Sequence, residues 1–195
     1  MSAPAQVRRP LAGRHTVVAL TGAVALIWAL LDQATKLLAE RTLRDGLVDL
    51  GFMDLRLVYN PNGAFSIPGV PGMFVGVTVV VLALVIRALP KTDRLSLAGT
   101  YGLVVGGAVG NCIDRVVRAP GFPNGAVVDF LDLRWWPVFN VADIGIVTGA
   151  ALLFVLLTKV DREERAAARR RAASPSVRPD AEGLPVVSGA DAPDR

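Results

Sequence analysis

The stretch that decides the fold is Phe139-Asn140-Val141-Ala142-Asp143, followed by the uncharged run IGIVTGAALLFVLLT at residues 144–158. A helix needs roughly 20 mostly apolar residues to cross a bilayer, and residues 141–160 meet this need. An ionisable side chain at the boundary of such a segment is costly and usually functional. The stretch therefore predicts a membrane-spanning helix that begins beside a functional carboxylate, Asp143.

Three more apolar segments of similar length lie at residues 15–37, 73–89 and 95–113. The chain is 52% hydrophobic and its mean hydropathy is +0.47, which is high for a soluble domain. We expect a mostly α-helical membrane protein with four transmembrane helices. The first segment is predicted to be an uncleaved anchor, because no small-x-small cleavage site leads from it into a soluble domain.

Basic residues lie at alternate junctions of these segments, which predicts that both ends are cytoplasmic by the positive-inside rule. They are Arg8, Arg9 and Arg14; Arg87, Lys91 and Arg94; and Arg162, Arg165, Arg169, Arg170 and Arg171. We expect a basic cytoplasmic N-terminus (1–14), a four-helix domain (15–160) and a cytoplasmic tail (161–195). The tail is predicted to be helical to residue 173 and largely disordered beyond it. This placement accounts for the net charge of +4, so no nucleic-acid partner is expected.

Two segments are expected on the outer side of the membrane. Residues 41–71 are predicted to form a small β-sheet between the first two helices, because period-2 alternation indicates a strand. The alternation sets Leu55, Leu57 and Tyr59 against Asp54, Arg56 and Val58, and a turn is expected at residues 60–63. Residues 118–137 are expected to be a Pro- and Gly-rich loop whose tryptophans, Trp135 and Trp136, suit the membrane interface.

The third segment repeats glycine every four residues, at Gly102, Gly106 and Gly110. Small residues at this spacing let helix backbones approach closely in lipid. A structural role in helix packing explains the pattern without any chemistry.

Polar side chains gather near the predicted outer ends of the four segments. Residues three or four apart on a helix share a face. Asp32 and Lys36, Asn111 and Asp114, and Asn140 and Asp143 have this spacing. The side chains are Asp32, Lys36, Asn60, Asn111, Asp114, Arg115, Asp129, Asn140 and Asp143. Structural roles fit some of them equally well: Asp32 and Lys36 as an ion pair, Asp114 and Arg115 as a cap of the third helix, and Asn140 as the N-cap of the fourth.

Two carboxylates are the remaining machinery for hydrolysis. The lone histidine, His15, is expected on the opposite side of the membrane, the lone Cys112 is expected to be a packing residue, and no residue set has zinc spacing. Neighbouring carboxylates do not both ionise easily, so one of them keeps a proton. The ionised partner can then activate water while the protonated one polarises a carbonyl. Asp129 and Asp143 are therefore predicted to be an acid–base pair for peptide hydrolysis.

Five ordered motifs resemble those of the bacterial lipoprotein signal peptidases (signal peptidase II), a family of membrane aspartic peptidases. The motifs are Asp32-Gln-Ala-Thr-Lys36, Asn60-Pro-Asn-Gly-Ala-Phe65, Gly106-Gly-Ala-Val-Gly-Asn-Cys-Ile-Asp-Arg115, Val127-Val-Asp-Phe130 and Phe139-Asn-Val-Ala-Asp143. The resemblance spans residues 32–143. One departure lies in the second motif, where Asn62 and Gly63 stand in place of the family's usual Gly and Ala.

The resemblance implies roles for individual residues. Asp129 and Asp143 match the catalytic pair, and Asp114 matches a motif position that we expect to be structural. A substrate-binding or supporting role is implied for Asn60, Asn111, Arg115, Asn140, Asp32, Lys36, Gly63 and Ala142.

The resemblance also implies a substrate and a location. The expected substrates are prolipoproteins with a diacylglyceryl-modified lipobox cysteine, cut just before that cysteine. The expected enzyme is a monomer surrounded by lipid in the bacterial inner membrane, with its active site near the extracytoplasmic face. No cofactor and no metal are expected.

Two other classes of protein were weighed against the peptidase. A small ion- or proton-coupled transporter would use the aspartates as relay groups, but no midplane charge or inverted repeat is apparent. A membrane scaffold packing through the glycine-rich segment would leave the paired aspartates unexplained.

Overall fold

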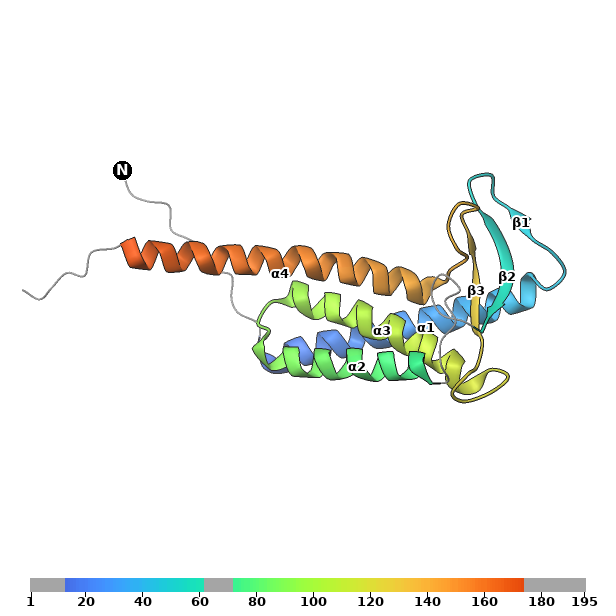
Figure 1. Ribbon diagram of the computed structural model, residues 1–195, viewed down its shortest axis with the longest axis horizontal. Helices are drawn as coiled ribbons and strands as arrows, with labels where there is room; N and C mark the ends of the chain where they lie inside the picture. Colours follow the sequence, from blue (N-terminus) through green and yellow to red (C-terminus); the bar gives the residue numbers. More distant parts are fainter. Residues whose placement is uncertain (1–12, 62–71, 174–195) are drawn as a thin grey trace, which may run out of the picture. The chain divides into compact units, whose positions relative to one another are not determined.

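The computed structural model describes residues 13–61 and 72–173. The chain divides into two compact units, Met1–Thr158 and Lys159–Arg195. The helices are α1 (Arg14–Thr42), α2 (Met73–Ala88), α3 (Leu95–Val117) and α4 (Val141–Ala173), with a short 3₁₀ turn η2 (Leu89–Lys91). The strands are β1 (Val48–Asp49), β2 (Asp54–Asn60) and β3 (Val127–Asp132). In the first unit, the helices lie side by side and the strands gather at one end of them (Figure 1).

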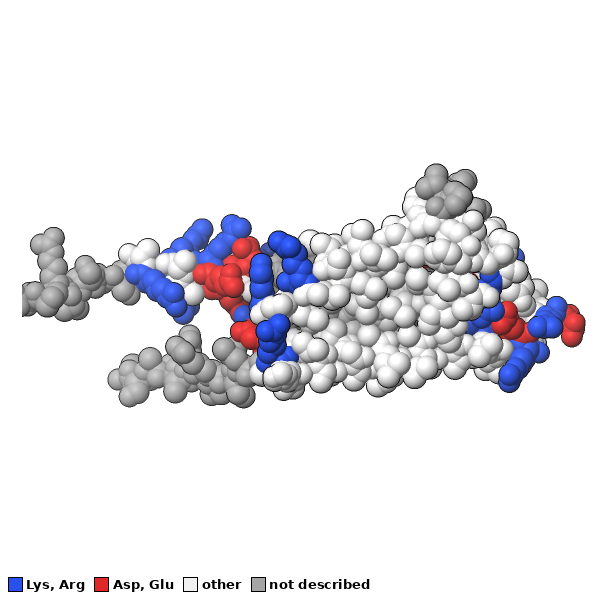
Figure 2. Space-filling model, turned by 90° about the horizontal axis from the view of Figure 1, so that it is seen from below, with Lys and Arg blue, Asp and Glu red and all other residues white. Residues whose placement is uncertain are grey.

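The prediction of four transmembrane helices is confirmed. Four helices in the described part of the chain are long and apolar enough to cross a membrane. On the face seen in Figure 2, the middle of the bundle shows no charged side chain, as a lipid-facing surface requires. Helix α1 continues past residue 37 to Thr42, and α3 continues past residue 113 to Val117. Asp114 and Arg115 therefore lie within the last turns of α3 rather than beyond its end.

The glycines of α3 bring its backbone against α1, as their spacing predicts. A Cβ added at Gly102 would lie 2.6 Å from the Val24 Cβ, and one at Gly106 would lie 2.7 Å from the Ala25 carbonyl oxygen. Trp28 of α1 also donates its Nε1–H to the Val141 carbonyl at 3.0 Å. Helix α1 thus contacts both α3 and the first residue of α4.

We expect Gly110→Ala to destabilise the protein while Gly99→Ala on the same helix does not. A Cβ at Gly110 would lie 2.6 Å from the Asp32 Oδ2, whereas one at Gly99 meets nothing within 4 Å. Overpacking of this kind costs about 1–3 kcal/mol, and alanine is otherwise the better helix former by about 1 kcal/mol. Thermal unfolding in detergent measures both variants, and equal unfolding temperatures would contradict the close approach at Gly110.

The sheet has the strand order β1-β2-β3 and is antiparallel throughout. Strand β2 confirms the expected sheet between the first two helices. The expected loop 118–137 is wrong in part, because it contains β3. The first four residues of β3, from Val127 to Phe130, are all buried. The strand therefore lacks the alternation that identifies a half-exposed strand.

The register of β2 against β3 shifts between Leu55 and Val58. Leu55 and Leu57 pack against the buried cluster of Val128 and Phe130, as the alternation predicts. Tyr59 does not share their environment: its side chain is 50% exposed. Tyr59 is paired with Val128, and its hydroxyl donates to the Glu40 Oε1 of α1 at 3.0 Å, so its polar end reaches a charged group instead of the apolar cluster.

Arg134 ties the segment before α4 to the β1–β2 hairpin. Its guanidinium contacts both Asp54 carboxylate oxygens, at 3.0 and 2.6 Å, and the Asp49 carboxylate at 2.7 Å. The residue has a left-handed φ of 68°, an uncommon conformation for a residue other than glycine. The next residue, Trp135, is 77% exposed, so this clamp holds an exposed aromatic side chain beside the start of α4.

Candidate active site

A buried ion cluster lies between α1 and α3. The Lys36 ammonium contacts the Asp32 Oδ2 and the Asp114 Oδ2, each at 2.8 Å, and the side chains of all three residues are fully buried. Its third short contact is a hydrogen bond of 2.9 Å to the Asn111 Oδ1. The expected pairing of Asp32 with Lys36 is therefore present, and it extends to the helix that carries Asn111.

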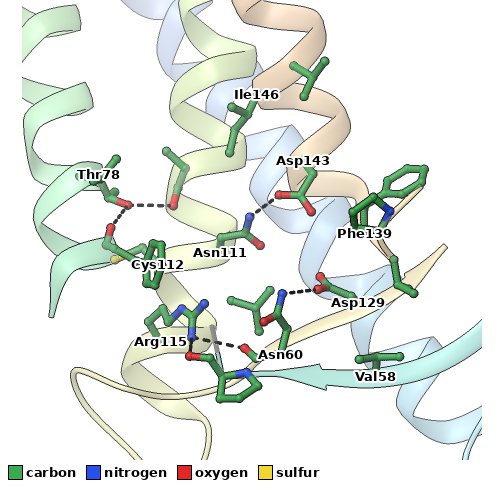
Figure 3. A pocket seen from close by; sticks show the side chains of 18 of the residues that line it. Val58, Asn60, Thr78, Asn111, Cys112, Arg115, Asp129, Phe139, Asp143 and Ile146 are labelled. Carbon is green, nitrogen blue, oxygen red and sulfur yellow. Dashed lines mark hydrogen bonds between the residues drawn. The ribbon is translucent and has the colours of Figure 1, made fainter. Parts of the chain in front are cut away.

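Asp143 lies in the first turn of α4, where it forms a reciprocal cap with Asn140. The Asp143 backbone N–H donates to the Asn140 Oδ1 at 3.0 Å, and the Asn140 N–H donates to the Asp143 Oδ2 at 3.2 Å. This arrangement satisfies two helix-end donors together and supports the N-cap reading of Asn140. The Asn111 Nδ2 donates to the other Asp143 oxygen, Oδ1, at 2.8 Å (Figure 3).

Asp129 lies on β3 with only 3% of its surface exposed. The Asn60 Nδ2 donates to its Oδ2 at 2.9 Å, and the Asn140 Nδ2 donates to its Oδ1 at 2.7 Å. Burial raises the pKa of Asp129 to about 6, and the nearby charge of Asp143 adds to this effect. The hydrogen bonds from Asn60 and Asn140 act in the opposite direction, because they favour the carboxylate.

Asn140 connects the two aspartates, because its amide bonds Asp129 while its oxygen and backbone bond Asp143. Both carboxylates line one cavity of about 770 Å³, and Figure 3 shows the Asp129 and Asp143 side chains on its wall, one from a strand and one from a helix. The two aspartates that the sequence analysis pairs therefore line the same cavity. A carboxylate pair in such a space can hold water and share a proton.

The cavity is polar at the aspartates and mostly apolar elsewhere. Its apolar wall comes from α2, α3, α4 and the segment before α4, and includes Phe74, Val77, Val81, Val104, Ile146, Val147, Trp136 and Phe139. A cavity with this lining can hold apolar chains next to the two carboxylates. Among the described residues, no group of three or more His, Cys, Asp or Glu side chains could hold a metal ion.

A family model described as signal peptidase (SPase) II matches residues 24–159. The chain belongs to the signal peptidase II family. The match contains the site residues described above, from Asp32 on α1 to Asp143 on α4. Membership makes the chain a membrane aspartic peptidase. The peptidase function is therefore favoured over the transporter and scaffold alternatives.

Two similar proteins of the family illustrate the range of the match. A lipoprotein signal peptidase of Rhodococcus jostii (strain RHA1) is 46% identical over 131 residues, covering 64% of this chain and 65% of its own. One of Halothermothrix orenii (strain H 168) is 39% identical over 144 residues, covering 71% and 95%. The chain thus spans just under two thirds of the first relative and nearly all of the second.

Two solved structures described as a bacterial membrane enzyme share the fold. One has a TM-score of 0.64 and 26% sequence identity, and the alignment covers 76% of this chain and 91% of the solved chain. The other has a TM-score of 0.61 and 25% identity, and covers 75% and 95%. The four-helix arrangement with its small sheet is therefore one that membrane enzymes adopt.

The remaining signal peptidase II motif residues fall into different places. Arg115 lines the cavity, where its Nη1 donates to the carbonyls of Pro61 and Gly125 at 3.0 and 2.9 Å. Asp114 is fully buried and accepts bonds from Lys36 and Arg118, which supports the structural reading. Ala142 is not among the residues that line the cavity. Its backbone N–H donates to the Asp32 Oδ1 at 2.8 Å. Gly63 lies outside the described residues.

Sequence reasoning missed two polar side chains beside this site. Gln33 donates to the Gly110 carbonyl and the Asp114 Oδ1, at 3.0 and 3.2 Å. Arg118 joins Asp114 to Glu40 at the C-terminal ends of α3 and α1. Arg118 is four residues after Asp114, so i,i+4 spacing was a usable signal for this pair. No spacing signal pointed to Gln33.

Proposed function

We propose that this chain removes the signal peptide from prolipoproteins whose lipobox cysteine already carries diacylglyceryl, cutting just before that cysteine. The observation that carries the proposal is the pair Asp129 and Asp143, bridged by Asn140 on the wall of one largely apolar cavity. The relatives named lipoprotein signal peptidase support the same substrate class. Acyl chains suit the apolar wall, and the peptide bond suits the polar end.

The proposed mechanism uses one proton shared by the two aspartates. The ionised carboxylate takes a proton from water, and the protonated one donates a hydrogen bond to the scissile carbonyl. The water oxygen then bonds to the carbonyl carbon, and the C–N bond breaks as a proton passes to the departing amine. The products are the carboxylate end of the signal peptide and the free amine of the lipidated cysteine. Asn60, Asn111 and Asn140 hold the two carboxylates in place.

The proposed setting is the bacterial inner membrane, with both chain ends in the cytoplasm and the site near the extracytoplasmic face. Basic residues at alternate helix junctions support this orientation. A lipidated substrate in the outer leaflet would then present its scissile bond at the level of Asp129 and Asp143. One chain contains all the proposed catalytic groups, so a monomer suffices.

Cleavage by the purified protein in lipid tests this function. The substrates are a diacylglyceryl-modified prolipoprotein and the same precursor without the lipid. We expect a single cut before the cysteine, at a much higher rate for the lipidated form. Equal cleavage of both forms would contradict lipid recognition, and no cleavage of either by folded protein would remove the proposed function.

We expect the cleavage rate to fall on the alkaline side of its pH profile as Asp129 releases the shared proton. The pKa of Asp129 is raised by burial to about 6 and lowered by the Asn60 hydrogen bond. Asn60→Leu removes that bond, so the pKa rises further and the alkaline limb moves to higher pH. Val58→Ala on the same strand is the control, because Val58 lines the cavity and its apolar side chain cannot donate a hydrogen bond to the Asp129 carboxylate. An unmoved limb in Asn60→Leu would contradict the assignment of the limb to Asp129.

A further inference from the structure

Lys36 decides which end of the Asn111 side-chain amide faces Asp143. An ammonium group can only donate hydrogen bonds, so the Asn111 atom 2.9 Å from the Lys36 Nζ must be the oxygen. The Asn140 Nδ2 donates to the same oxygen at 3.1 Å. The other end of the amide is therefore the NH₂ group, and it donates to the Asp143 Oδ1 at 2.8 Å.

The position of Lys36 is itself fixed. Its side chain is fully buried, and its three N–H donors match three acceptors: the carboxylates of Asp32 and Asp114 and the oxygen of Asn111. Lys36 is not among the residues that line the cavity. Lys36 can act on the reaction through its charge, which partly offsets the rise that burial causes in the pKa of Asp129, and through Asn111, the neighbour that contacts both Lys36 and an aspartate of the pair.

We propose that Lys36 is a positioning residue that locks the Asn111 amide so that its N–H donates to Asp143. This inference rests on the proposed function, because it assigns the lock to the same pair of aspartates. Without Lys36, the Asn111 oxygen keeps only the longer, uncharged bond from Asn140 at 3.1 Å, and the amide can turn and present its oxygen to Asp143. An amide N–H favours a carboxylate, whereas an amide oxygen favours a protonated carboxyl. The lock thus keeps Asp143 in the form that can accept a proton from water.

The ionisable groups around this lock come from each neighbouring element. Asp32 lies on the same helix as Lys36, and the others are Asp114 and Arg115 on α3, Arg118 just beyond it, Asp129 on β3 and Asp143 on α4. Asp32 and Asp114 would lose their counter-ion if Lys36 alone were neutralised. The test therefore uses Asp32→Asn with Lys36→Met, which removes one charge of each sign. Asp114 keeps its ion pair with Arg118 at 2.9 Å.

The pH profile of cleavage separates positioning from a structural role. In Asp32→Asn/Lys36→Met we expect a loss of rate of about tenfold or more, the scale of one lost hydrogen bond to a charged group, and an acidic limb at higher pH. Asp32→Asn alone keeps the Lys36–Asn111 bond, so its acidic limb should stay in place. A structural role would lower the rate by the same factor at every pH. An acidic limb that stays in place in the folded double variant would overturn the proposal.

A second comparison keeps the test decisive if the double variant does not fold. In the Asp32→Asn background, Lys36→Arg retains a group that can only donate, whereas Lys36→Gln introduces one that can also accept. We expect a displaced acidic limb in Lys36→Gln and an unmoved one in Lys36→Arg. The same limb in both variants would overturn the proposal. If the wild type fails to cleave the lipidated precursor, the proposed function fails. If the wild type cleaves and the acidic limb is unmoved in the Lys36 variants, only the proposed positioning role of Lys36 fails.

Discussion

Asp143→Asn and Asp129→Asn are each expected to lower cleavage of the diacylglyceryl-modified precursor by about 10²- to 10⁴-fold, the range that a positioned acid or base contributes. Each substitution keeps the side-chain shape and removes the ability to share a proton. Both carboxylates accept two hydrogen bonds, from Asn111 and Asn140 at Asp143 and from Asn60 and Asn140 at Asp129. An amide can keep one of these, so the fold should persist in both variants.

Single-turnover cleavage and thermal unfolding, measured on the same preparations, separate loss of chemistry from loss of fold. Asp161→Asn is the matched control, because Asp161 is an exposed aspartate on α4 that pairs with Arg165. We also expect the double variant Asp129→Asn/Asp143→Asn to be about as slow as either single one, because groups that act as a unit are not additive. Full activity in either single variant would remove that residue from the pair and direct attention to Asp114.

The fold was predictable where one physical signal dominates. Long uncharged runs predicted four spans, because charges are costly in lipid. Glycine spacing predicted a close helix contact for the third span, and the structure shows that the partner is α1. Strand β3 was not predictable in this way. It is only six residues long, and its buried positions include Asp129 and Asp132, so neither an apolar run nor an alternation identifies it. The shift of β2 against β3 was equally hidden, because a local irregularity leaves no mark on the pattern of apolar residues.

The sequence predicted which residues belong to the site better than it predicted the hydrogen bonds between them. The spacing of Asn140 and Asp143 predicted a helix cap, and the two are joined in both directions. The contact of Lys36 with Asn111 joins residues far apart in the sequence, so it depends on how α1 and α3 are aligned. Spacing within one helix carries no information about that alignment. The same holds for the Asn60 bond to Asp129, which depends on strand register.

Asn140→Asp is expected to fold nearly as well as the wild type and to cleave on the order of 10²-fold more slowly. Aspartate and asparagine are similar as N-caps, so the bond from the Asp143 N–H can persist. The lost group is the amide that donates to the Asp129 Oδ1 at 2.7 Å, and a bond to a charged group is worth about 1.5–3 kcal/mol. A third carboxylate beside the pair adds repulsion.

Asn140→Ala separates the two roles of this residue, because it removes both the cap and the amide. It should lose about 1 kcal/mol of stability, the usual worth of an N-cap, in addition to activity. The Asn140→Asp variant should recover part of its rate at lower pH, because a protonated carboxyl can again donate to Asp129. Unfolding temperatures and pH profiles of the two variants check this directly. Wild-type cleavage by Asn140→Asp would mean that Asp129 does not need the Asn140 amide, and Asn140 would then be a helix cap alone.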